Sequence, residues 1–558
     1  MLKRGNVPPL NPQLKISLYD VECNNGRPSP LLPIADSTTN LAFAKGALMD
    51  RRQLLTFAGL AGVGATIGCQ PGQPQQVRRP PTTAPATGLT QAPGAVGVDF
   101  AGLRSGLTGT VLLPQDAGYT AAAKPYNAAL GIRRPAAIIR VADTADVATC
   151  VRRAGGRGVP LAARSGGHSY EGWSTPNRGI VVDLSALRAI QVRPDGTAIV
   201  GAGALLIDVY AALAAAGRAL PAGSCPSVGI AGLTLGGGIG VLCRAYGLTC
   251  DHVRAAEVVT ADGEVRTVDA NRDADLFWAL RGGGGGNAGV VTAFTFDTVP
   301  APIISTFSLA FPADRTGRVL TAWLDWMGTA PDTLWSLCAV TSAATPTNRV
   351  TGTWIGPSDA LAGQLARLVD EVGASPTRES SRRLGYLDAM KYFAGCTSSV
   401  AACHPASFPA GTLGRNSFHA ASRMVDHPLT ASSAAMVVGL VQGGPPMVLL
   451  FDALGGQVGE ITSGETAFPH RRALASVQIY SGADNGKSAV FGVQRDLASL
   501  VGTGAYVNYI NADQPDWALA YYGANLPRLR TIVRHYDPNG VFTFPQSALL
   551  AEPARPPN

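Results

Sequence analysis

Two glycine-rich loops, one carrying a histidine and the other a cysteine, constrain the fold of this chain more than any other feature. The first loop reads Arg164-Ser165-Gly166-Gly167-His168-Ser169. The second runs from Gly223-Ser224-Cys225 to Gly229 and is followed by Gly236-Gly237-Gly238-Ile239-Gly240. Glycine lets a backbone approach a ligand closely and leaves N–H groups free for phosphate oxygens. A nucleophilic side chain in each loop could also bond covalently to one bound cofactor.

Both loops fall inside a stretch that predicts a mixed α+β domain between about residues 127 and 300. Apolar runs at 137–141 and 179–184 are typical of short strands. A third run, Val159–Ala163, leads directly into the first glycine loop. The stretch 144–155 has helical spacing of its apolar residues and ends in glycine, so it predicts a helix between two of the strands.

The rest of the chain divides into two parts. From 301 to 500, strand-like runs such as 334–340 and 349–355 alternate with helical stretches such as 359–372. This alternation predicts a substrate domain with an antiparallel sheet covered by helices. The last segment, 503–550, begins with a cluster of aromatic residues.

A third glycine run, Gly284-x-Gly286-x-x-Gly289, matches the dinucleotide-binding fingerprint letter by letter. That fingerprint follows a strand and opens a helix. Here a predicted helix over 275–280 precedes the run and a predicted strand over 290–296 follows it, which argues against a Rossmann site. The run 236–240 lacks the Lys-Ser/Thr pair of a P-loop, and no G-x-S-x-G or H-E-x-x-H motif favours a hydrolase.

Composition narrows the class of protein. Hydrophobic residues make up 46% of the 558 residues, which is enough for a large core. The net charge is +7, but the basic residues are scattered, so nucleic-acid binding is not indicated. No spaced set of cysteines and histidines predicts a metal site.

An export signal precedes the predicted domains, within residues 49–97. Asp50-Arg51-Arg52-Gln53-Leu54-Leu55 is a twin-arginine signal, and the apolar run 57–68 after it is too short to remain in a bilayer. Residues 1–48 are then an upstream gene-model extension or an unusually long leader. The sequence before Cys69 resembles a lipoprotein box imperfectly, which leaves a lipid anchor and simple secretion both open. A Pro-, Thr- and Gln-rich linker completes this region.

The cysteine count indicates one thiol with a special use. Nine cysteines occur, and setting aside Cys23 and Cys69 leaves an odd number for an exported protein. Cys225 is the candidate for the special thiol, whereas Cys396 and Cys403 lie seven residues apart and could pair. The cysteines in apolar surroundings predict buried thiols: Cys150, Cys243, Cys250 and Cys338.

Taken together, these motifs resemble the berberine bridge enzyme-like branch of the flavin oxidases, which have the vanillyl-alcohol oxidase (PCMH-type) fold. The matching pieces occur in the family's order: Arg164–Gly172, Val182–Leu184, Gly223–Gly229, Gly236–Gly240, Arg244–Asp251, Asp275–Gly284, Tyr506–Tyr509 and Tyr522–Asn525. The resemblance implies an α+β protein with a two-subdomain FAD-binding domain. The segment 503–550 would complete that domain, beside the substrate domain.

The resemblance also implies one FAD attached at two points, with His168 on the 8α-methyl carbon and Cys225 on ring carbon C6. Two attachments fix the ring without using its edges, so the space above it stays open to a bulky substrate. The further cofactor-binding residues that the resemblance implies are Arg164, Ser165, Gly166, Gly167 and Ser169 at the pyrophosphate, Gly229, Gly232, Gly236 and Gly240 in the second loop, Val290 at the adenine, and Asn508 at the flavin.

The same resemblance assigns the catalytic base to Tyr509. A free tyrosine has a pKa of about 10, so the base needs a neighbour that lowers it. Ile239 stands where many plant members carry a helper tyrosine, which leaves Tyr506, Gln478 and Arg471 as candidates. Val228, three residues after Cys225, implies a small cavity for oxygen beside the flavin, as in oxidases of the family.

The predicted function is therefore an exported FAD oxidase. It takes hydride from a secondary alcohol or hemiacetal of a sugar or secondary metabolite to flavin N5, and O₂ reoxidises the flavin to give H₂O₂. A flavin dehydrogenase with another acceptor and a non-catalytic surface-binding protein of the same fold remain alternatives. The twin-arginine route carries folded proteins, which suits a chain that loads FAD before export. Its partners would be a small-molecule substrate and O₂, and the sequence leaves the oligomeric state open.

Overall fold

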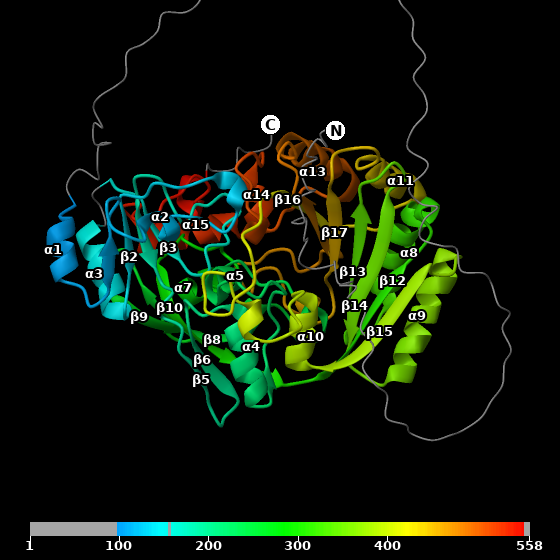
Figure 1. Ribbon diagram of the computed structural model, residues 1–558, viewed down its shortest axis with the longest axis horizontal. Helices are drawn as coiled ribbons and strands as arrows, with labels where there is room; N and C mark the ends of the chain where they lie inside the picture. Colours follow the sequence, from blue (N-terminus) through cyan, green and yellow to red (C-terminus); the bar gives the residue numbers. More distant parts are fainter. Residues whose placement is uncertain (1–97, 155–157, 552–558) are drawn as a thin grey trace, which may run out of the picture. The chain divides into compact units, whose positions relative to one another are not determined.

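The computed structural model describes residues 98–154 and 158–551 (Figure 1). The predicted extension, the twin-arginine signal and the linker, with Cys23 and Cys69, lie outside the described residues. The strands of the described part form sheets of four, five and seven strands and one two-stranded ribbon. The α+β class predicted from the sequence is confirmed.

The first glycine loop follows directly from a strand of the four-stranded sheet. Its strands, in spatial order, are β1 (Thr110–Leu112), β2 (Ala137–Arg140), β4 (Ile180–Asp183) and β3 (Leu161–Arg164). β4 pairs in parallel with β2 and β3, and all its residues are buried, as an uninterrupted apolar run in a parallel sheet requires. Helix α3 (Thr144–Ala154) crosses from β2 to β3, so β3 ends at Arg164 and the loop begins there. β1 lies upstream of residue 127, outside the domain that the sequence predicts. The sequence does not predict this strand, because three residues are too few to show a strand pattern.

The five-stranded sheet is antiparallel. Its strands, in spatial order, are β5 (Ile190–Val192), β6 (Thr197–Gly201), β10 (Val290–Asp297), β8 (Val253–Val259) and β9 (Val265–Asp269). β8 and β9 form a hairpin, and Gly263 at its turn has φ +80°, where a side chain would be strained. The run Gly284–Gly289 lies between helix α7 (Ala274–Ala279) and β10, so the predicted order of helix, run and strand is confirmed.

The seven-stranded sheet is antiparallel throughout. Its strands, in spatial order, are β15 (Arg378–Gly385), β12 (Ile303–Ala310), β14 (Thr347–Trp354), β13 (Leu334–Thr341), β17 (Val448–Ala453), β18 (Ala475–Ser481) and β16 (His419–Val425). Figure 1 shows helices along one face of this sheet: α8 (Thr316–Thr329), α9 (Ser358–Val372), α11 (Ala431–Gly439) and α13 (Lys487–Val501). This is the predicted antiparallel sheet with helical cover.

Shorter elements connect these layers. The ribbon consists of β7 (Arg218–Ala219) and β11 (Val299–Pro300), and the remaining α-helices are α1 (Phe100–Ser105), α2 (Tyr119–Ala122), α4 (Leu206–Ala215), α5 (Ile230–Leu235), α6 (Cys243–Tyr246), α10 (Tyr386–Phe393), α12 (Gln457–Glu460), α14 (Trp517–Tyr522) and α15 (Leu526–Tyr536). Helix α15 packs on α7, so the C-terminal segment returns to the part of the chain that carries the glycine loops.

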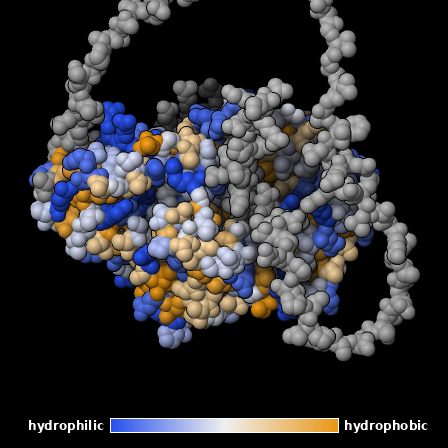
Figure 2. Space-filling model, viewed as in Figure 1, coloured by the Kyte–Doolittle hydropathy of each residue, from blue (hydrophilic) through white to orange (hydrophobic). Residues whose placement is uncertain are grey.

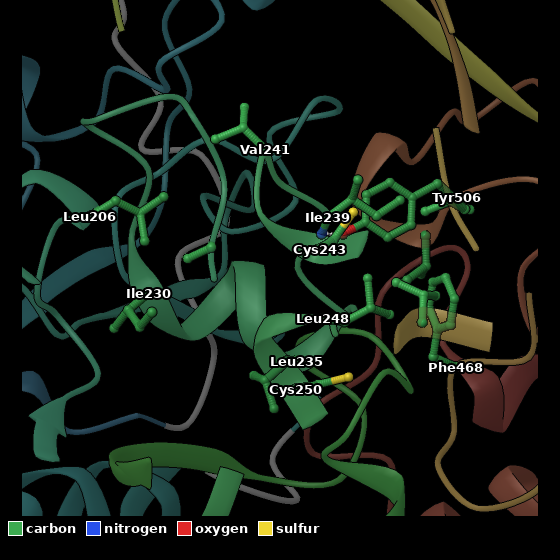
Figure 3. Packing of buried hydrophobic residues seen from close by; sticks show 14 of the residues in the cluster. Leu206, Ile230, Leu235, Ile239, Val241, Cys243, Leu248, Cys250, Phe468 and Tyr506 are labelled. Atoms are coloured by element: carbon green, nitrogen blue, oxygen red, sulfur yellow. Dashed lines mark hydrogen bonds between the residues drawn. The ribbon is translucent and has the colours of Figure 1, made fainter. Parts of the chain in front are cut away.

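The second glycine loop is embedded in apolar packing. Leu235 and Ile239 are buried beside the loop (Figure 3), together with Leu248 from the segment after it. Phe468 and Tyr506, which come from much later in the chain, pack on the same cluster. A Cβ at Gly237 would lie 2.9 Å from the Phe468 ring, so the loop and the aromatic side chain meet without room for another group.

The visible surface of the described part is of mixed polarity. Figure 2 shows hydrophilic and hydrophobic residues interspersed on the visible face of the described part. Over residues 98–154 and 158–551, every helix is too short or too polar to cross a bilayer.

The predicted pair Cys396 and Cys403 forms a disulfide.

Candidate functional site

A cavity of about 630 Å³ is lined by both glycine loops and by the C-terminal segment. Ser165, Gly166, Gly167, His168 and Ser169 of the first loop all lie on its wall. From the second loop, the cavity is lined by Cys225, Val228, Gly229 and Gly232, and from the C-terminal segment by Tyr506, Asn508 and Tyr509. The volume is within the range of cofactor and substrate sites, about 300–1,000 Å³.

Arg164 anchors the first loop from behind. Its guanidinium forms a buried ion pair with Asp183 at 2.7 Å and donates to the carbonyl oxygen of Ala122 at 2.7 Å. The side chain therefore points away from the cavity and does not line it. The contact of Arg164 with the pyrophosphate that the resemblance implies goes through its backbone N–H group, so it does not depend on where this side chain points.

The two loops touch each other through glycines. A Cβ at Gly166 would overlap the backbone nitrogen of Gly229, and a Cβ at Gly229 would overlap the Ser165 hydroxyl. Gly167 has φ +72°, which also favours glycine. Gly236 and Gly240 lie away from this cavity, because Gly236 backs onto the side chain of Asn508 and Gly240 onto the carbonyl of Ala222. Glycine at these two positions allows close packing of the chain rather than contact with a ligand.

His168 and Cys225 lie close enough to share one partner. The hydroxyl of Ser227 is 3.1 Å from His168 Nε2 and 3.8 Å from Cys225 Sγ. Burial lowers the pKa of His168 to about 3, so the imidazole is neutral. Burial raises the pKa of the Cys225 thiol, and hydrogen bonds from Ser227 and Val228 oppose this rise. Among the free cysteines of the described residues, Cys225 is partly exposed and the others are buried, in line with the special use predicted for it.

Val290 is not on the cavity wall. The cavity is lined by its neighbours Gly289 and Val291, while Val290 is buried on the other side of β10. Successive side chains of a strand point to opposite faces, so the predicted adenine contact would fall on Val291 instead. The sequence could not decide between two adjacent valines.

Tyr506 anchors the second loop. Its hydroxyl accepts hydrogen bonds from the backbone of Gly238 at 2.9 Å and of Ile239 at 3.2 Å, and from Asn508 Nδ2 at 2.9 Å. These bonds oppose burial, which raises the pKa of Tyr506 to about 12. Tyr506 therefore positions the second loop, and its catalytic role stays a prediction.

Tyr509 faces the cavity beside other aromatic groups. Its ring stacks on Tyr170 with centroids 5.3 Å apart and meets Tyr506 edge-on at 5.0 Å. Gln478 of β18 also lines the cavity and donates from Nε2 to the Tyr170 hydroxyl. Burial, followed by the charge of Asp452, raises the pKa of Tyr509 well above its ordinary value. Tyr509 and Gln478 both line the cavity, but the groups around Tyr509 raise its pKa, whereas the sequence analysis expects a neighbour that lowers it.

Asp452 of β17 is a site residue that sequence reasoning missed. It lies with Tyr509, Gln478 and Trp335 around a second cavity of about 30 Å³, large enough for one water molecule. Burial raises the pKa of Asp452 to about 8. The only signal in the sequence was an acidic residue at the end of the apolar run Met447–Asp452, and a buried strand by itself explained that run.

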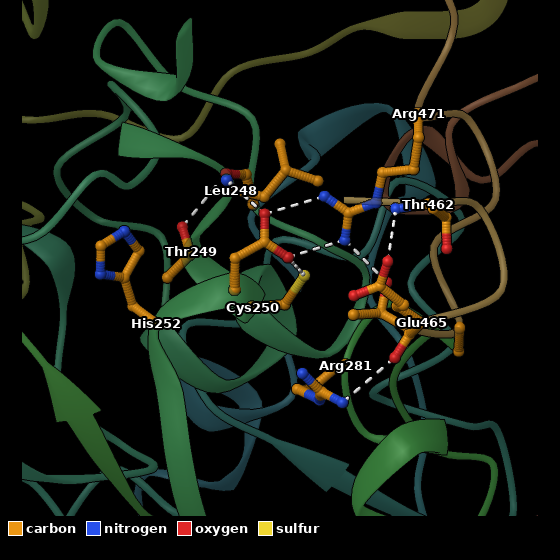
Figure 4. Close-up of polar contacts among 12 residues, drawn as sticks. Leu248, Thr249, Cys250, His252, Arg281, Thr462, Glu465 and Arg471 are labelled. Carbon is orange, nitrogen blue, oxygen red and sulfur yellow. Dashed lines mark hydrogen bonds and ion pairs between the residues drawn. The ribbon is translucent and has the colours of Figure 1, made fainter. Parts of the chain in front are cut away.

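Arg471 stabilises the segment that follows the second loop. Its guanidinium binds both carboxylate oxygens of Asp251, at 2.8 and 2.7 Å, and also donates to the Thr466 hydroxyl (Figure 4). Arg471 is 1% exposed and does not line the cavity, so it is not the neighbour that adjusts Tyr509. The bond joins the segment of Asp251 to the chain leading into β18.

Polar and aromatic side chains outside the two glycine loops also line the large cavity. Arg133 and Ser174 line it, and Arg133 Nε and Ser174 Oγ are buried without a hydrogen-bond partner among the described residues. Such atoms need a polar partner, which a ligand or a water molecule supplies. Trp173 and Phe544 add aromatic walls, with centroids 5.5 Å apart. The run Gly284–Gly286, although not a Rossmann fingerprint, lines the same cavity. Among the described residues, no cluster of His, Cys, Asp and Glu could hold a metal ion.

Comparisons with known proteins agree with this site. The model of the FAD binding domain matches residues 135–269, and the model described as "Berberine and berberine like" matches 505–548. The FAD-linked oxidoreductase YgaK of Bacillus subtilis is 32% identical over 79% of this chain and 97% of its own length. The glucooligosaccharide oxidase of Sarocladium strictum is 30% identical over 73% of this chain and 86% of its own length.

Solved structures extend the comparison. The berberine bridge enzyme-like protein 1 of Physcomitrella patens has a TM-score of 0.75 and 28% identity, covering 80% of this chain and 98% of its own. A chitooligosaccharide oxidase has a TM-score of 0.73 and 27% identity, with the same two coverages. The fold, the FAD-binding domain and the C-terminal segment agree throughout, and the chain belongs to the berberine bridge enzyme-like family of FAD-linked oxidoreductases.

Proposed function

We propose that this oxidoreductase carries FAD bound at both His168 and Cys225, and that it oxidises a CH–OH group with O₂ as the acceptor. One observation carries the proposal: His168 and Cys225 lie on one cavity wall and share the hydroxyl of Ser227. The solved glucooligosaccharide oxidase of Acremonium strictum, 25% identical, is described as revealing a novel flavinylation. FAD bound here supplies a hydride acceptor and a group that reacts with oxygen.

The residues around Tyr509 supply the proton chemistry. Burial keeps Tyr509 neutral, so its oxygen takes the hydroxyl proton of the substrate only as its own hydrogen passes on, while hydride leaves the neighbouring carbon. Tyr170 and Gln478 hold the ring of Tyr509 and the substrate hydroxyl in place. The proton moves on to Asp452 through the small cavity that both residues line. A carboxyl with a pKa of about 8 is matched to this task near neutral pH.

Val228 supports oxygen as the acceptor. It lies on the cavity wall in the same loop as Cys225, where a small side chain leaves room for O₂. A dehydrogenase that passes electrons to another acceptor would carry a bulkier residue here. The product of oxygen reduction would be H₂O₂.

The substrate would be a sugar or a secondary metabolite with a secondary alcohol or hemiacetal. Relatives of 28–30% identity include a chitooligosaccharide oxidase, a glucooligosaccharide oxidase and a monolignol oxidoreductase. The cavity wall near Tyr509 is aromatic and uncharged, with Tyr126, Phe418 and Tyr480. Such a wall suits the flat apolar face of a sugar or an aromatic ring. Export by the twin-arginine signal Arg51-Arg52 is part of the same proposal.

Two measurements test the proposal. The purified protein should stay yellow after acid precipitation, because the flavin is bonded to the chain. A substrate panel of oligosaccharides and aromatic alcohols is then added without oxygen, and loss of the flavin absorbance identifies substrates. Readmitted air should restore the colour with one H₂O₂ formed per substrate. A flavin that bleaches but is not reoxidised by air would identify a dehydrogenase.

A further inference from the structure

Ser227 is the point at which the two presumed attachment residues meet. Its side chain is almost fully buried, with 2% exposure, between the two loops. The hydroxyl oxygen lies 3.1 Å from His168 Nε2 and 3.8 Å from Cys225 Sγ. A serine hydroxyl has one hydrogen to donate and lone pairs to accept, so it can bond both neighbours at once.

The ring of His168 is held on a second side as well. Tyr126 stacks on it with ring centroids 3.6 Å apart and planes at 19°. The Tyr126 hydroxyl accepts from Asn416 Nδ2 at 3.0 Å, and its backbone N–H donates to the Gly167 carbonyl at 3.1 Å. The imidazole plane is therefore fixed, and Nε2 has the Ser227 hydroxyl as its hydrogen-bond partner. His168 lines the cavity.

We propose that Ser227 is the positioning residue for cofactor attachment: its Oγ accepts the Nε2 hydrogen of His168 and donates its own hydrogen to Cys225 Sγ. A neutral imidazole carries one hydrogen, so a hydrogen on Nε2 leaves the lone pair on Nδ1 as the nucleophile. A hydrogen bond to sulfur favours the thiolate, which is the nucleophilic form of cysteine. One hydroxyl thus prepares both side chains. The inference rests on the doubly attached FAD proposed above.

The attachment balances with dioxygen as the oxidant. At His168, the bond from Nδ1 to the 8α carbon replaces one hydrogen of the imidazole and one of the methyl group. At Cys225, the bond from Sγ to C6 replaces the thiol hydrogen and the ring hydrogen. In each case two electrons and two protons pass to O₂, which becomes H₂O₂. The hydrogen that His168 loses is the one on Nε2, and the Ser227 oxygen is its first acceptor.

The experiment follows attachment rather than turnover. The full chain is produced without flavin and mixed with FAD in air, and samples are denatured at intervals. Flavin that remains on the protein is measured by fluorescence, and the modified peptides are identified by mass. Cys225→Ala and His168→Ala chains report each attachment separately, and Ser227→Ala and Ser227→Thr are added to each. Thr234→Val serves as the matched control, because it removes another buried hydroxyl, which bonds only within α5.

Ser227→Ala should slow attachment at His168 by roughly 10–100-fold, the loss that is typical when a metal-ligating histidine loses its hydrogen-bond partner. The effect at Cys225 should be smaller, because that contact is longer. Ser227→Thr should restore both rates, which a purely structural role would not predict, and Thr234→Val should match the parent. Attachment at the parent rate in Ser227→Ala overturns the role of Ser227 and leaves the proposed function intact.

A measurement on the unmodified protein covers the case in which the variants do not fold. Digestion of the loaded chain releases the histidyl flavin, and NMR identifies the nitrogen that carries it. Linkage through Nδ1 supports the proposed tautomer, and linkage through Nε2 overturns it while still confirming covalent FAD. A parent chain that loses all its flavin on denaturation overturns both this inference and the proposed attachment.

Discussion

Asp452→Asn replaces a desolvated carboxyl beside Tyr509 with a neutral amide of the same size. In the folded protein the pKa of Asp452 is raised to about 8 by burial, from an ordinary 3.8. Each pKa unit is worth about 1.4 kcal/mol, and water entering the small cavity screens part of the cost, so roughly 2–6 kcal/mol is expected. This free energy opposes folding whenever the unfolded chain ionises and the folded chain does not.

The sign of the effect follows from the two pKa values. Below pH 3.8 the carboxyl is neutral in both states, and asparagine should change little. As pH rises from there to about 8, only the unfolded chain releases the proton, so the parent protein loses stability. Asp452→Asn does not titrate, and its advantage should grow over this window and stay constant above it.

Urea unfolding at several values between pH 4 and pH 9 measures this difference, with tryptophan fluorescence as the signal. Asp370→Asn, an exposed position on α9, is the control and should follow the parent at every pH. Parallel pH profiles for Asp452→Asn and the parent would refute the reasoning, because Asp452 would then ionise as freely in the folded protein as in the unfolded chain. If Asp452 also receives the proton from Tyr509, flavin reduction by substrate should accelerate as pH rises through about 8 in the parent but not in Asp452→Asn.

His168→Ala combined with Cys225→Ala should release all flavin on acid denaturation, and any flavin left on the pellet would place an attachment elsewhere. Tyr509→Phe should slow anaerobic flavin reduction by roughly 10²–10⁴, the usual loss for a general base, in stopped-flow measurements. Near-normal reduction would move the base to another group. Val228→Leu should slow reoxidation by O₂ and leave reduction unchanged, since it fills space beside the cavity wall; an unaltered oxygen rate would exclude gating by this residue.

The sequence was sufficient where the signal was local. The strand over 179–184 and the helix over 144–155 follow from apolar spacing over a few residues, and the structure has them as β4 and α3. The sequence also excluded a Rossmann site at Gly284–Gly289, because that conclusion depends only on the helix before the run and the strand after it. The glycine loops around His168 and Cys225 also indicated a cofactor. The close approach that glycine allows and the nucleophilicity of imidazole and thiol are properties of the residues themselves, so they do not depend on the fold.

The sequence was insufficient where the answer depended on orientation. Arg164 sits beside the loop in sequence, but its side chain turns to Asp183. Val290 and Val291 are chemically identical, and the pleat of β10 decides which one faces the cavity. Tyr506 has the residue type of a catalytic group, yet its oxygen is occupied by the backbone of a loop more than 200 residues earlier in the chain.

Long-range contacts decided the rest of the site. Asp452 of β17, Gln478 of the paired strand β18 and Tyr509 line one small cavity, and no local pattern encodes that meeting. Tyr126 covers His168 from a segment outside the predicted domain. In the sequence, Ser227 is one of several small residues in a loop, and only the structure places its oxygen beside both His168 and Cys225. Residue chemistry and local periodicity identified the cofactor-binding loops. The packing of distant strands and loops decided which side chains are buried, and burial in turn decided the charge state and the partner of each side chain.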